Sequence, residues 1–178
     1  MIVNFKFKVI VVGEPTVGKT TLIRKYTEKK FGALYIPTVG VQVSIKQIPF
    51  KIEKFNEKCL VELNIWDIAG HMRFQKIRKI FYEGANAFLL LYDVTNKKTF
   101  DGITHYIEDL KGIIGNICGI LIGNKIDFKK ERIISEEDGR KKAESLRLDF
   151  IETSAKTGAN LDYVFELITT NILSQVKD

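Results

Sequence analysis

The sequence has few of the residues that mark secreted, fibrous or linker-rich chains. Its 178 residues include only two cysteines, Cys59 and Cys118, which lie far apart and match no metal-ligand spacing. This scarcity predicts a reducing, cytoplasmic setting in which both cysteines serve as small apolar residues. With three prolines and 13 glycines, the chain contains no low-complexity segment, and no internal repeat is present.

Long hydrophobic runs are also missing. The longest strongly apolar run, AFLLLY at residues 87–92, is far too short to cross a bilayer. Lys6 and Lys8 interrupt the apolar start, so no signal-peptide core forms, and isoleucine at position 2 excludes N-myristoylation. The final residues SQVKD contain no cysteine for prenylation. We therefore expect no transmembrane segment and at most a peripheral contact with a membrane.

The formal net charge of +6 raises the possibility of attraction to anionic lipid or nucleic acid. However, no aromatic residues interleave with the basic clusters at 29–30, 97–98, 129–130 and 140–142, which favours solvated helix faces and loops. We expect no nucleic-acid partner. Hydrophobic residues make up 45% and charged residues 28% of the chain, as in a soluble globular protein, and the length suits one domain over residues 1–178.

The hydrophobic pattern predicts alternating strands and helices. Buried or half-buried strands are expected at 5–12, 41–48, 59–66, 87–94, 118–124 and 149–154. Helices are expected from residue 19 to Gly32 and at 98–112, 135–147 and 160–175, with Ser135 and Asp138 capping the third. Strands 41–48 and 59–66 should form an antiparallel hairpin with one wet face, joined by a long loop at 49–58. The pattern predicts an α/β fold: a mostly parallel sheet with helices on both faces and one antiparallel edge strand.

The segment GEPTVGKT, residues 13–20, lies between a predicted strand and a predicted helix. It fits the pattern G-x-x-x-x-G-K-[ST], in which Gly13 and Gly18 let backbone N–H groups point at phosphate oxygens. Lys19 would bring a positive charge to the β- and γ-phosphates, and the Thr20 hydroxyl can bind Mg²⁺. This segment predicts a phosphate site without selecting a base.

Two later segments select guanine. In GNKID, residues 123–127, the Asp127 carboxylate can accept hydrogen bonds from guanine N1–H and the 2-amino group, whereas it would repel the N1 lone pair of adenine. Asn124 is expected to brace the neighbouring loops and the base edge, and the Lys125 stem to cover one face of the ring. In ETSAKTG, residues 152–158, the Ala155 N–H can donate to guanine O6 and Lys156 can pack beside the ring.

The ordered segments GEPTVGKT, YIPT, WDIAG, GNKID and ETSAK resemble those of the Ras superfamily of small GTPases over roughly residues 5–175. YIPTVGVQV followed by LNIWDIAG is most similar to the Rab branch. The resemblance implies a P-loop NTPase G domain with a six-stranded mixed sheet and five helices. It also implies a monomeric molecular switch that binds GTP or GDP with Mg²⁺, hydrolyses GTP, and serves signalling or vesicle trafficking.

The resemblance assigns roles to individual residues. Phe31 would stack on guanine. The first switch would be residues 32–40, in which Thr38 would reach Mg²⁺ and the γ-phosphate. In the second switch, residues 67–80, Asp67 would hold Mg²⁺ through water and the Gly70 N–H would contact the γ-phosphate. The implied metal ligands are Thr20, Thr38 and Asp67. The implied nucleotide site is Gly13, Glu14, Pro15, Thr16, Val17, Gly18, Lys19, Thr20, Thr21, Phe31, Tyr35, Thr38, Asp67, Gly70, Asn124, Lys125, Asp127, Ser154, Ala155 and Lys156.

Effector and regulator proteins would read the two switches of such a protein. Val43, Trp66 and Phe81 fall near the positions where Rab proteins present a hydrophobic surface triad. Ordinary strand packing explains Trp66 equally well.

Several positions depart from the family pattern. His71 stands where a glutamine orients the attacking water; a neutral imidazole can still hold a water, so the expected catalytic set is His71, Lys19, Thr38 and Gly70. Pro15 places a ring near the mouth of the γ-phosphate site and leaves less room for an activating arginine. Met72 replaces an acidic residue, and the hairpin at 49–58 is longer than expected. The terminal cysteine is also missing, so the chain is either shortened or acts without a lipid anchor.

These departures predict slow GTP hydrolysis. They leave open a binding module that stays loaded with GTP and recruits effectors, its hydrolysis being vestigial. A phosphate-loop kinase acting on a small acceptor is a third reading, but it gives GNKID and ETSAK no purpose.

Overall fold

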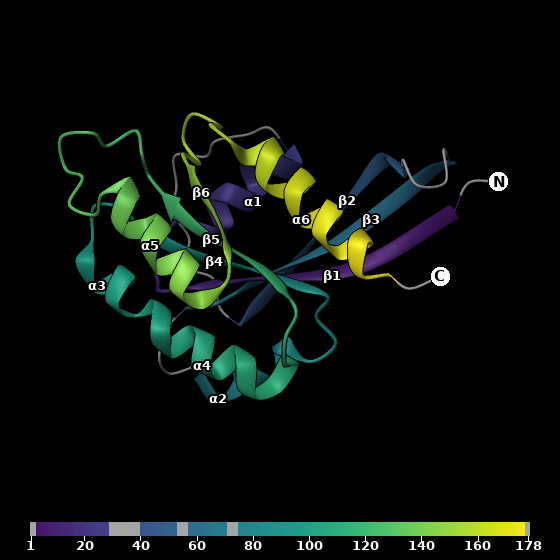
Figure 1. The fold of residues 1–178 in the computed structure, drawn as a ribbon, viewed down its shortest axis with the longest axis horizontal. Coiled ribbons are helices and arrows are strands. Elements are labelled where there is room, and N and C mark those ends of the chain that lie inside the picture. Colours follow the sequence, from purple (N-terminus) through teal and green to yellow (C-terminus); the bar gives the residue numbers. More distant parts are fainter. Residues whose placement is uncertain (1–2, 29–39, 53–56, 71–74, 177–178) are drawn as a thin grey trace.

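A six-stranded sheet in the order β2-β3-β1-β4-β5-β6 forms the centre of the molecule (Figure 1). The computed structural model describes residues 3–28, 40–52, 57–70 and 75–176. The strands are β1 (Val3–Gly13), β2 (Val41–Ile52), β3 (Glu57–Ile68), β4 (Ala87–Asp93), β5 (Cys118–Asn124) and β6 (Asp149–Thr153). β2 pairs antiparallel with β3, and the other neighbouring strands are parallel. The predicted mixed sheet with one antiparallel edge strand is confirmed.

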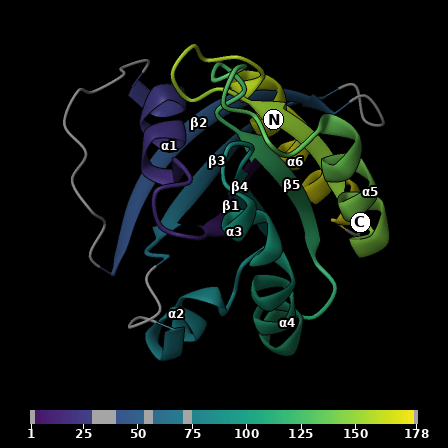
Figure 2. The same ribbon diagram turned by 90° about the vertical axis from the view of Figure 1, so that its left-hand side faces the viewer.

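Helices cover both faces of this sheet. They are α1 (Lys19–Glu28), α2 (Gln75–Tyr82), α3 (Lys97–Asp101), α4 (Ile103–Ile114), α5 (Glu136–Leu146) and α6 (Leu161–Gln175). Figures 1 and 2 show α1 and α6 on one face and α2 to α5 on the other. Each face has its own apolar core, one including Val9, Leu63 and Phe165 and the other Ile10, Leu90 and Tyr106. All seven residues of β4 are buried, because this strand is covered on both sides.

Most helix boundaries agree with the sequence pattern. The expected cap of α5 is confirmed, since the Asp138 N–H donates to the Ser135 hydroxyl at 3.0 Å. The single helix expected at 98–112 is wrong, because Gly102 divides the segment into α3 and α4. For this reason the described residues contain six helical segments rather than five. α2 was not among the helices predicted from periodicity. Within these residues no helix has the length and hydrophobicity to span a bilayer.

The loop predicted at 49–58 is largely strand. β2 continues to Ile52 and β3 begins at Glu57, with Pro49 opposite Leu60 and Phe50 opposite Cys59. Phe50 packs against the core beneath α6, which favours continued pairing. Pro49 is tolerated because β2 is an edge strand, where a missing N–H has little effect on the ladder. Residues 53–56 lie outside the described part of the chain.

Candidate functional site

The segment predicted to bind phosphate, residues 13–20, forms the turn from β1 to α1. Gly13 and Gly18 have φ angles of 140° and 102°, which strain any residue with a side chain. A Cβ on Gly13 would collide with the Leu91 carbonyl of the adjacent strand, so β4 passes too close for a larger residue. Lys19 is 6% exposed, and its ammonium donates to the Gly13 and Glu14 carbonyls at 2.9 and 2.8 Å. Two backbone carbonyls of the loop therefore hold the lysine ammonium in place.

Thr20 and Asp67 bring oxygen atoms together beside this loop. The Thr20 hydroxyl donates to the Asp67 carboxylate, although Thr20 lies in the first turn of α1 and Asp67 near the end of β3. Asp67 is only 2% exposed, so its charge is largely removed from water. A hydroxyl and one buried carboxylate fit Mg²⁺, which takes oxygen ligands and commonly shares a site with phosphates and waters. Thr38, the third expected ligand, lies outside the described residues.

Asn124 joins three segments at the other end of the site. Its amide donates to the Val17 carbonyl at 2.8 Å, tying the end of β5 to the phosphate loop. Its oxygen accepts from the Thr153 hydroxyl at 3.0 Å and the Ala155 N–H at 3.1 Å. The bracing role predicted for Asn124 is thus present. The Ala155 N–H, however, points to Asn124 in this structure, so a guanine O6 would have to share this donor or take it over.

The Asp127 carboxylate is oriented by a neighbouring loop. The Ser154 hydroxyl donates to one Asp127 oxygen at 2.6 Å, and the Thr157 N–H donates to the same hydroxyl at 3.1 Å. Lys125 adopts a left-handed backbone conformation with φ of 74°, and its ammonium pairs with Asp93 at 2.6 Å. These contacts fix two polar side chains of the GNKID segment at the edge of the cavity.

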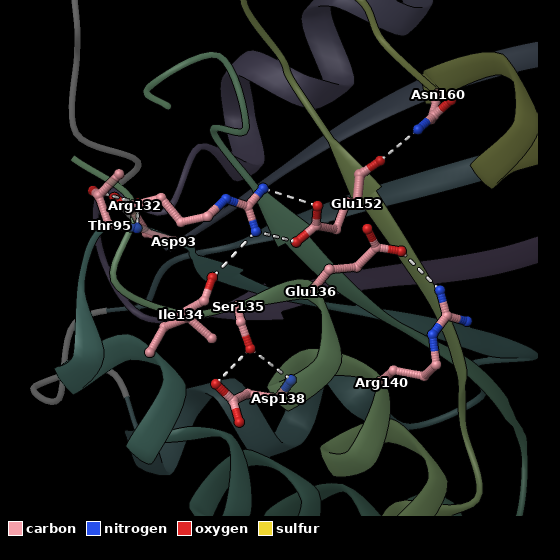
Figure 3. A network of polar contacts seen from close by, with 10 residues as sticks. All are labelled: Asp93, Thr95, Arg132, Ile134, Ser135, Glu136, Asp138, Arg140, Glu152 and Asn160. Atoms are coloured by element: carbon pink, nitrogen blue, oxygen red, sulfur yellow. Dashed lines mark hydrogen bonds and ion pairs between the residues drawn. The ribbon is translucent and has the colours of Figure 1, made fainter. Parts of the chain in front are cut away.

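A polar network stiffens the loops behind these residues (Figure 3). The Arg132 guanidinium forms two hydrogen bonds with Glu152, at 2.7 and 2.9 Å, and a third with the Ile134 carbonyl at 3.1 Å. The hydrogen bonds with Glu152 raise the pKa of Arg132 above its usual value. The Asn160 amide donates to the Glu152 carbonyl at 2.8 Å. The segment after β5 is therefore fastened to β6 directly before Thr153 and Ser154.

All these segments border one cavity of about 460 Å³ at the carboxyl ends of the strands. In parallel sheets this edge is where ligands bind. The residues that line it and were predicted from the sequence are Pro15, Thr16, Gly18, Lys19, Thr20, Thr21, Gly70, Asn124, Lys125, Asp127, Ala155 and Lys156. Five other predicted residues are described by the structure but do not line the cavity: Gly13, Glu14, Val17, Asp67 and Ser154. The predictions for Phe31, Tyr35, Thr38 and His71 lie outside the described residues.

Sequence reasoning missed two residues of the cavity wall, Ala69 and Phe128. Both adjoin predicted residues, Gly70 and Asp127, and this adjacency is the one signal that could have found them. Phe128 is 43% exposed, and the Lys156 ammonium lies 5.6 Å from the centre of its ring. This pair forms an apolar and cationic part of the cavity wall beside Asp127.

Three apolar residues predicted to form a surface triad lie close together on one side of the sheet. Val43 on β2 is directly opposite Trp66 on β3, and the rings of Trp66 and Phe81 are 6.3 Å apart. Val43 is 44% exposed, Ile45 on the same strand is 61% exposed, and Ile80 on α2 is 65% exposed. The apolar side of β2 thus faces solvent at this point rather than the core.

Comparison with known proteins agrees with this geometry. The family model described as "Ras family" matches residues 8–174. The chain is 36% identical over 177 residues to "Ras-related protein Rab-1" of Theileria parva, covering 98% of this chain and 76% of the relative. It is 34% identical over 176 residues to "Ras-related protein Rab-3" of Caenorhabditis elegans, covering 98% and 78%. "Ras-related protein Rab-3C" of Bos taurus is 35% identical over 176 residues, covering 98% and 75%.

Proposed function

This chain belongs to the Ras family of small GTPases, and from that premise we propose a slowly hydrolysing, Mg²⁺-dependent guanine-nucleotide switch. As a member of the family it binds GTP and GDP and hydrolyses GTP. We further propose that residues 1–178 form one G domain, and that partner proteins read its switches at 32–40 and 67–80.

One observation carries the proposal: four separate segments converge on a single cavity. The phosphate loop, the end of β3 and the segments after β5 and β6 contribute Lys19, Gly70, Asp127 and Ala155 to its lining. A cation at one end and a carboxylate at the other suit a ligand with a polyphosphate tail and a base that presents two donors. Guanosine nucleotides have both features, whereas adenosine nucleotides lack the donor pair.

Each group has a proposed task in binding. Backbone N–H groups of residues 13–20 and the Lys19 ammonium hold the phosphates, while Asp127 selects the base. Thr20 and Asp67 would hold Mg²⁺, which neutralises charge on the phosphate oxygens when it is bound. Gly70 would sense the third phosphate through its N–H, and His71 would orient the attacking water. Loss of the third phosphate would then release both switches.

Pro15 supports a low rate of hydrolysis. It lines the cavity together with Gly70, so its ring takes up space at this end of the cavity. Less room is then left for a group supplied by a partner to stabilise the transferring phosphoryl group. The same crowding favours a second candidate function, a module that remains GTP-loaded and recruits effectors without turnover.

The exposed apolar side chains support recognition by protein partners. Trp66 and Phe81 flank the second switch in the sequence, Val43 lies opposite Trp66, and Ile45 is exposed on the same strand as Val43. Contiguous exposed apolar groups are characteristic of interaction sites. We propose that effectors or regulators contact this surface when the switches are ordered.

The first experiment measures nucleotide affinity. We expect the purified protein to prefer GDP and GTP over ADP and ATP by orders of magnitude, and Asp127→Ala to lose most of this preference. Equal affinity for guanosine and adenosine nucleotides, or full affinity in Asp127→Ala, would refute guanine recognition. A tightly bound adenine nucleotide would instead support a phosphate-loop kinase.

The second experiment separates the switch from the GTP-loaded module. Nucleotide released from freshly purified protein should be mainly GDP for a switch that turns over and mainly GTP for a holding module. Single-turnover cleavage of GTP should be slow and should become slower in His71→Ala. A fast wild-type rate that His71→Ala leaves unchanged would contradict both the slow rate and the role of His71.

A further inference from the structure

Two polar contacts join α4 to the second switch. The Tyr106 hydroxyl donates to the Gly70 carbonyl at 3.1 Å, and the Lys79 ammonium pairs with the Asp109 carboxylate at 3.0 Å. Tyr106 and Asp109 are three residues apart on α4, so they project from the same face of the helix. Figures 1 and 2 show this helix beside α2, which carries Lys79. We call these two contacts the α4 clamp.

The first contact fixes Gly70 at the cavity wall. Gly70 lies against the phosphate loop so closely that a Cβ would meet the Gly13 carbonyl and would lie 2.7 Å from the Pro15 nitrogen. On its other side Gly70 accepts the hydrogen bond from Tyr106, a residue 1% exposed. Gly70 is thus held between the loop and α4, in the wall that also contains Lys19 and Thr20. Displacement of Gly70 from this position would break the buried hydrogen bond with Tyr106.

The second contact gives α2 a preferred place. The Asp109 side chain is 8% exposed, whereas that of Lys79 is 47% exposed. If α2 moved away, Lys79 would regain water, whereas Asp109 would lose the cation at 3.0 Å and keep His105, which lies 3.8 Å away on α4. Loss of one ion-pair partner from a largely buried carboxylate is destabilising, so the pair resists displacement of α2. The two contacts therefore hold both ends of the second switch against the same helix.

We propose that Tyr106 and Asp109 are positioning residues that hold the second switch where it can contact a third phosphate. This inference rests on the proposed function, because it requires Gly70 to sense the γ-phosphate. A nucleotide whose third phosphate contacts Gly70 binds more tightly when Gly70 is already held in place. GDP has no third phosphate, so its affinity does not depend on Gly70. The clamp should therefore raise the affinity for GTP relative to that for GDP.

The test measures the dissociation constants of GDP and of a non-hydrolysable GTP analogue, both with Mg²⁺. Tyr106→Phe and Lys79→Met should each reduce the preference for the analogue over GDP by about three- to tenfold, as expected for one intramolecular hydrogen bond or ion pair. GDP affinity should remain at the wild-type value. Lys79→Arg, which keeps the cation, should retain most of the preference. Lys97→Met is the matched control, since it removes a 3.1 Å pair with Asp101 on α3.

The outcomes distinguish this inference from the proposed function. If the wild type binds guanine nucleotides but neither variant changes the preference, the clamp is refuted. An equal loss of affinity for GDP and the analogue also refutes it, because that result indicates general damage to the fold. Thermal unfolding identifies such damage independently. Failure of the wild type to bind guanine nucleotides would refute the proposed function, and the clamp with it.

Discussion

Tyr92 shows how a single polar atom can be buried without a partner. The residue is fully buried, with Phe100 packed edge-on at 5.0 Å, and burial raises the pKa of its hydroxyl above the usual value. Within the described residues this hydroxyl has no hydrogen-bond partner. Tyr92→Phe should leave the free energy of unfolding unchanged or raise it by up to about 1 kcal/mol, because it removes a desolvated polar group.

Urea denaturation measures this effect, and Tyr106→Phe is the matched control. The Tyr106 hydroxyl donates to Gly70, so its removal should lower the free energy of unfolding by about 1 kcal/mol. If Tyr92→Phe were destabilising by a similar amount, its hydroxyl would have to bond a group outside the described residues.

Ser135 should link stability to pH. Its hydroxyl donates to the Asp138 carboxylate at 2.6 Å and accepts from the Asp138 N–H at 3.0 Å, and the hydroxyl bond is the main cause that lowers the pKa of Asp138. A lowered carboxyl pKa stabilises the fold above the unfolded value of about 4, and this stabilisation is lost as pH falls through the folded value. Ser135→Ala should therefore lower stability more at pH 7 than near pH 3, because it removes both the helix cap and the bond that favours ionised Asp138.

Thermal unfolding of both proteins between pH 7 and pH 3 tests this difference. Ser145→Ala serves as the control, because the Ser145 hydroxyl donates to the Lys142 carbonyl on the same helix. A stability difference between Ser135→Ala and wild type that stays constant over the whole range would contradict the coupling to Asp138.

At the scale of secondary-structure elements, two arginine–glutamate pairs in Figure 3 differ in their surroundings. In the Arg132–Glu152 pair, the side chains are 26% and 12% exposed, and the pair joins the loop after β5 to β6. In the Arg140–Glu136 pair they are 55% and 60% exposed, on α5 alone. Arg132→Met should lower the free energy of unfolding by about 2 kcal/mol. Arg140→Met should lower it by about 0.5 kcal/mol or less.

The two arginine variants should also differ in nucleotide binding. Since Arg132 braces the segments that contain Asp127 and Ala155, Arg132→Met should weaken GDP binding severalfold, and Arg140→Met should not. Fluorescence titration with a labelled GDP would measure both. Similar losses in the two variants would show that the loop contact has no special role.

An element is well predicted from the sequence when residues within it determine its conformation, and poorly predicted when contacts with distant segments determine it. Strands 87–94 and 118–124 were predicted to within one residue, because continuous apolar runs between polar segments identify strands buried on both faces. The ends of β2 and β3 were missed, since their charged residues resemble a loop and their pairing depends on a neighbouring strand. α2 also escaped periodicity analysis, and its position is set by contacts with α4 such as Lys79–Asp109.

The candidate site shows the same limit. Lys19, Asn124 and Asp127 were predicted because motif spacing places them directly after strands, at one edge of the sheet. The Arg132–Glu152 and Tyr106–Gly70 contacts join residues 20 and 36 positions apart. Neither belongs to a short motif, so only the folded structure brings these partners together.

At the scale of the whole molecule, a bound nucleotide with Mg²⁺ would connect distant parts of the sheet. Thr20 lies in the first turn of α1, Asp67 lies near the end of β3 and Asp127 follows β5. A ligand that binds only the folded state at about a hundred times its dissociation constant raises the free energy of unfolding by about 2.7 kcal/mol. GDP with Mg²⁺ should therefore raise the melting temperature, and EDTA should remove the share of this increase that depends on the metal.

The metal-dependent share should depend on Thr20. Replacing its hydroxyl in Thr20→Val removes a proposed Mg²⁺ ligand, so EDTA should then cause little further change in the melting temperature of the GDP-bound protein. Thr27→Val is the matched control, because the Thr27 hydroxyl donates to the Ile23 carbonyl within the same helix. That variant should keep the wild-type response to EDTA. If EDTA lowered the melting temperature of GDP-bound Thr20→Val and wild type equally, Thr20 would not be a metal ligand. The proposal that the metal joins α1 to β3 would then be wrong.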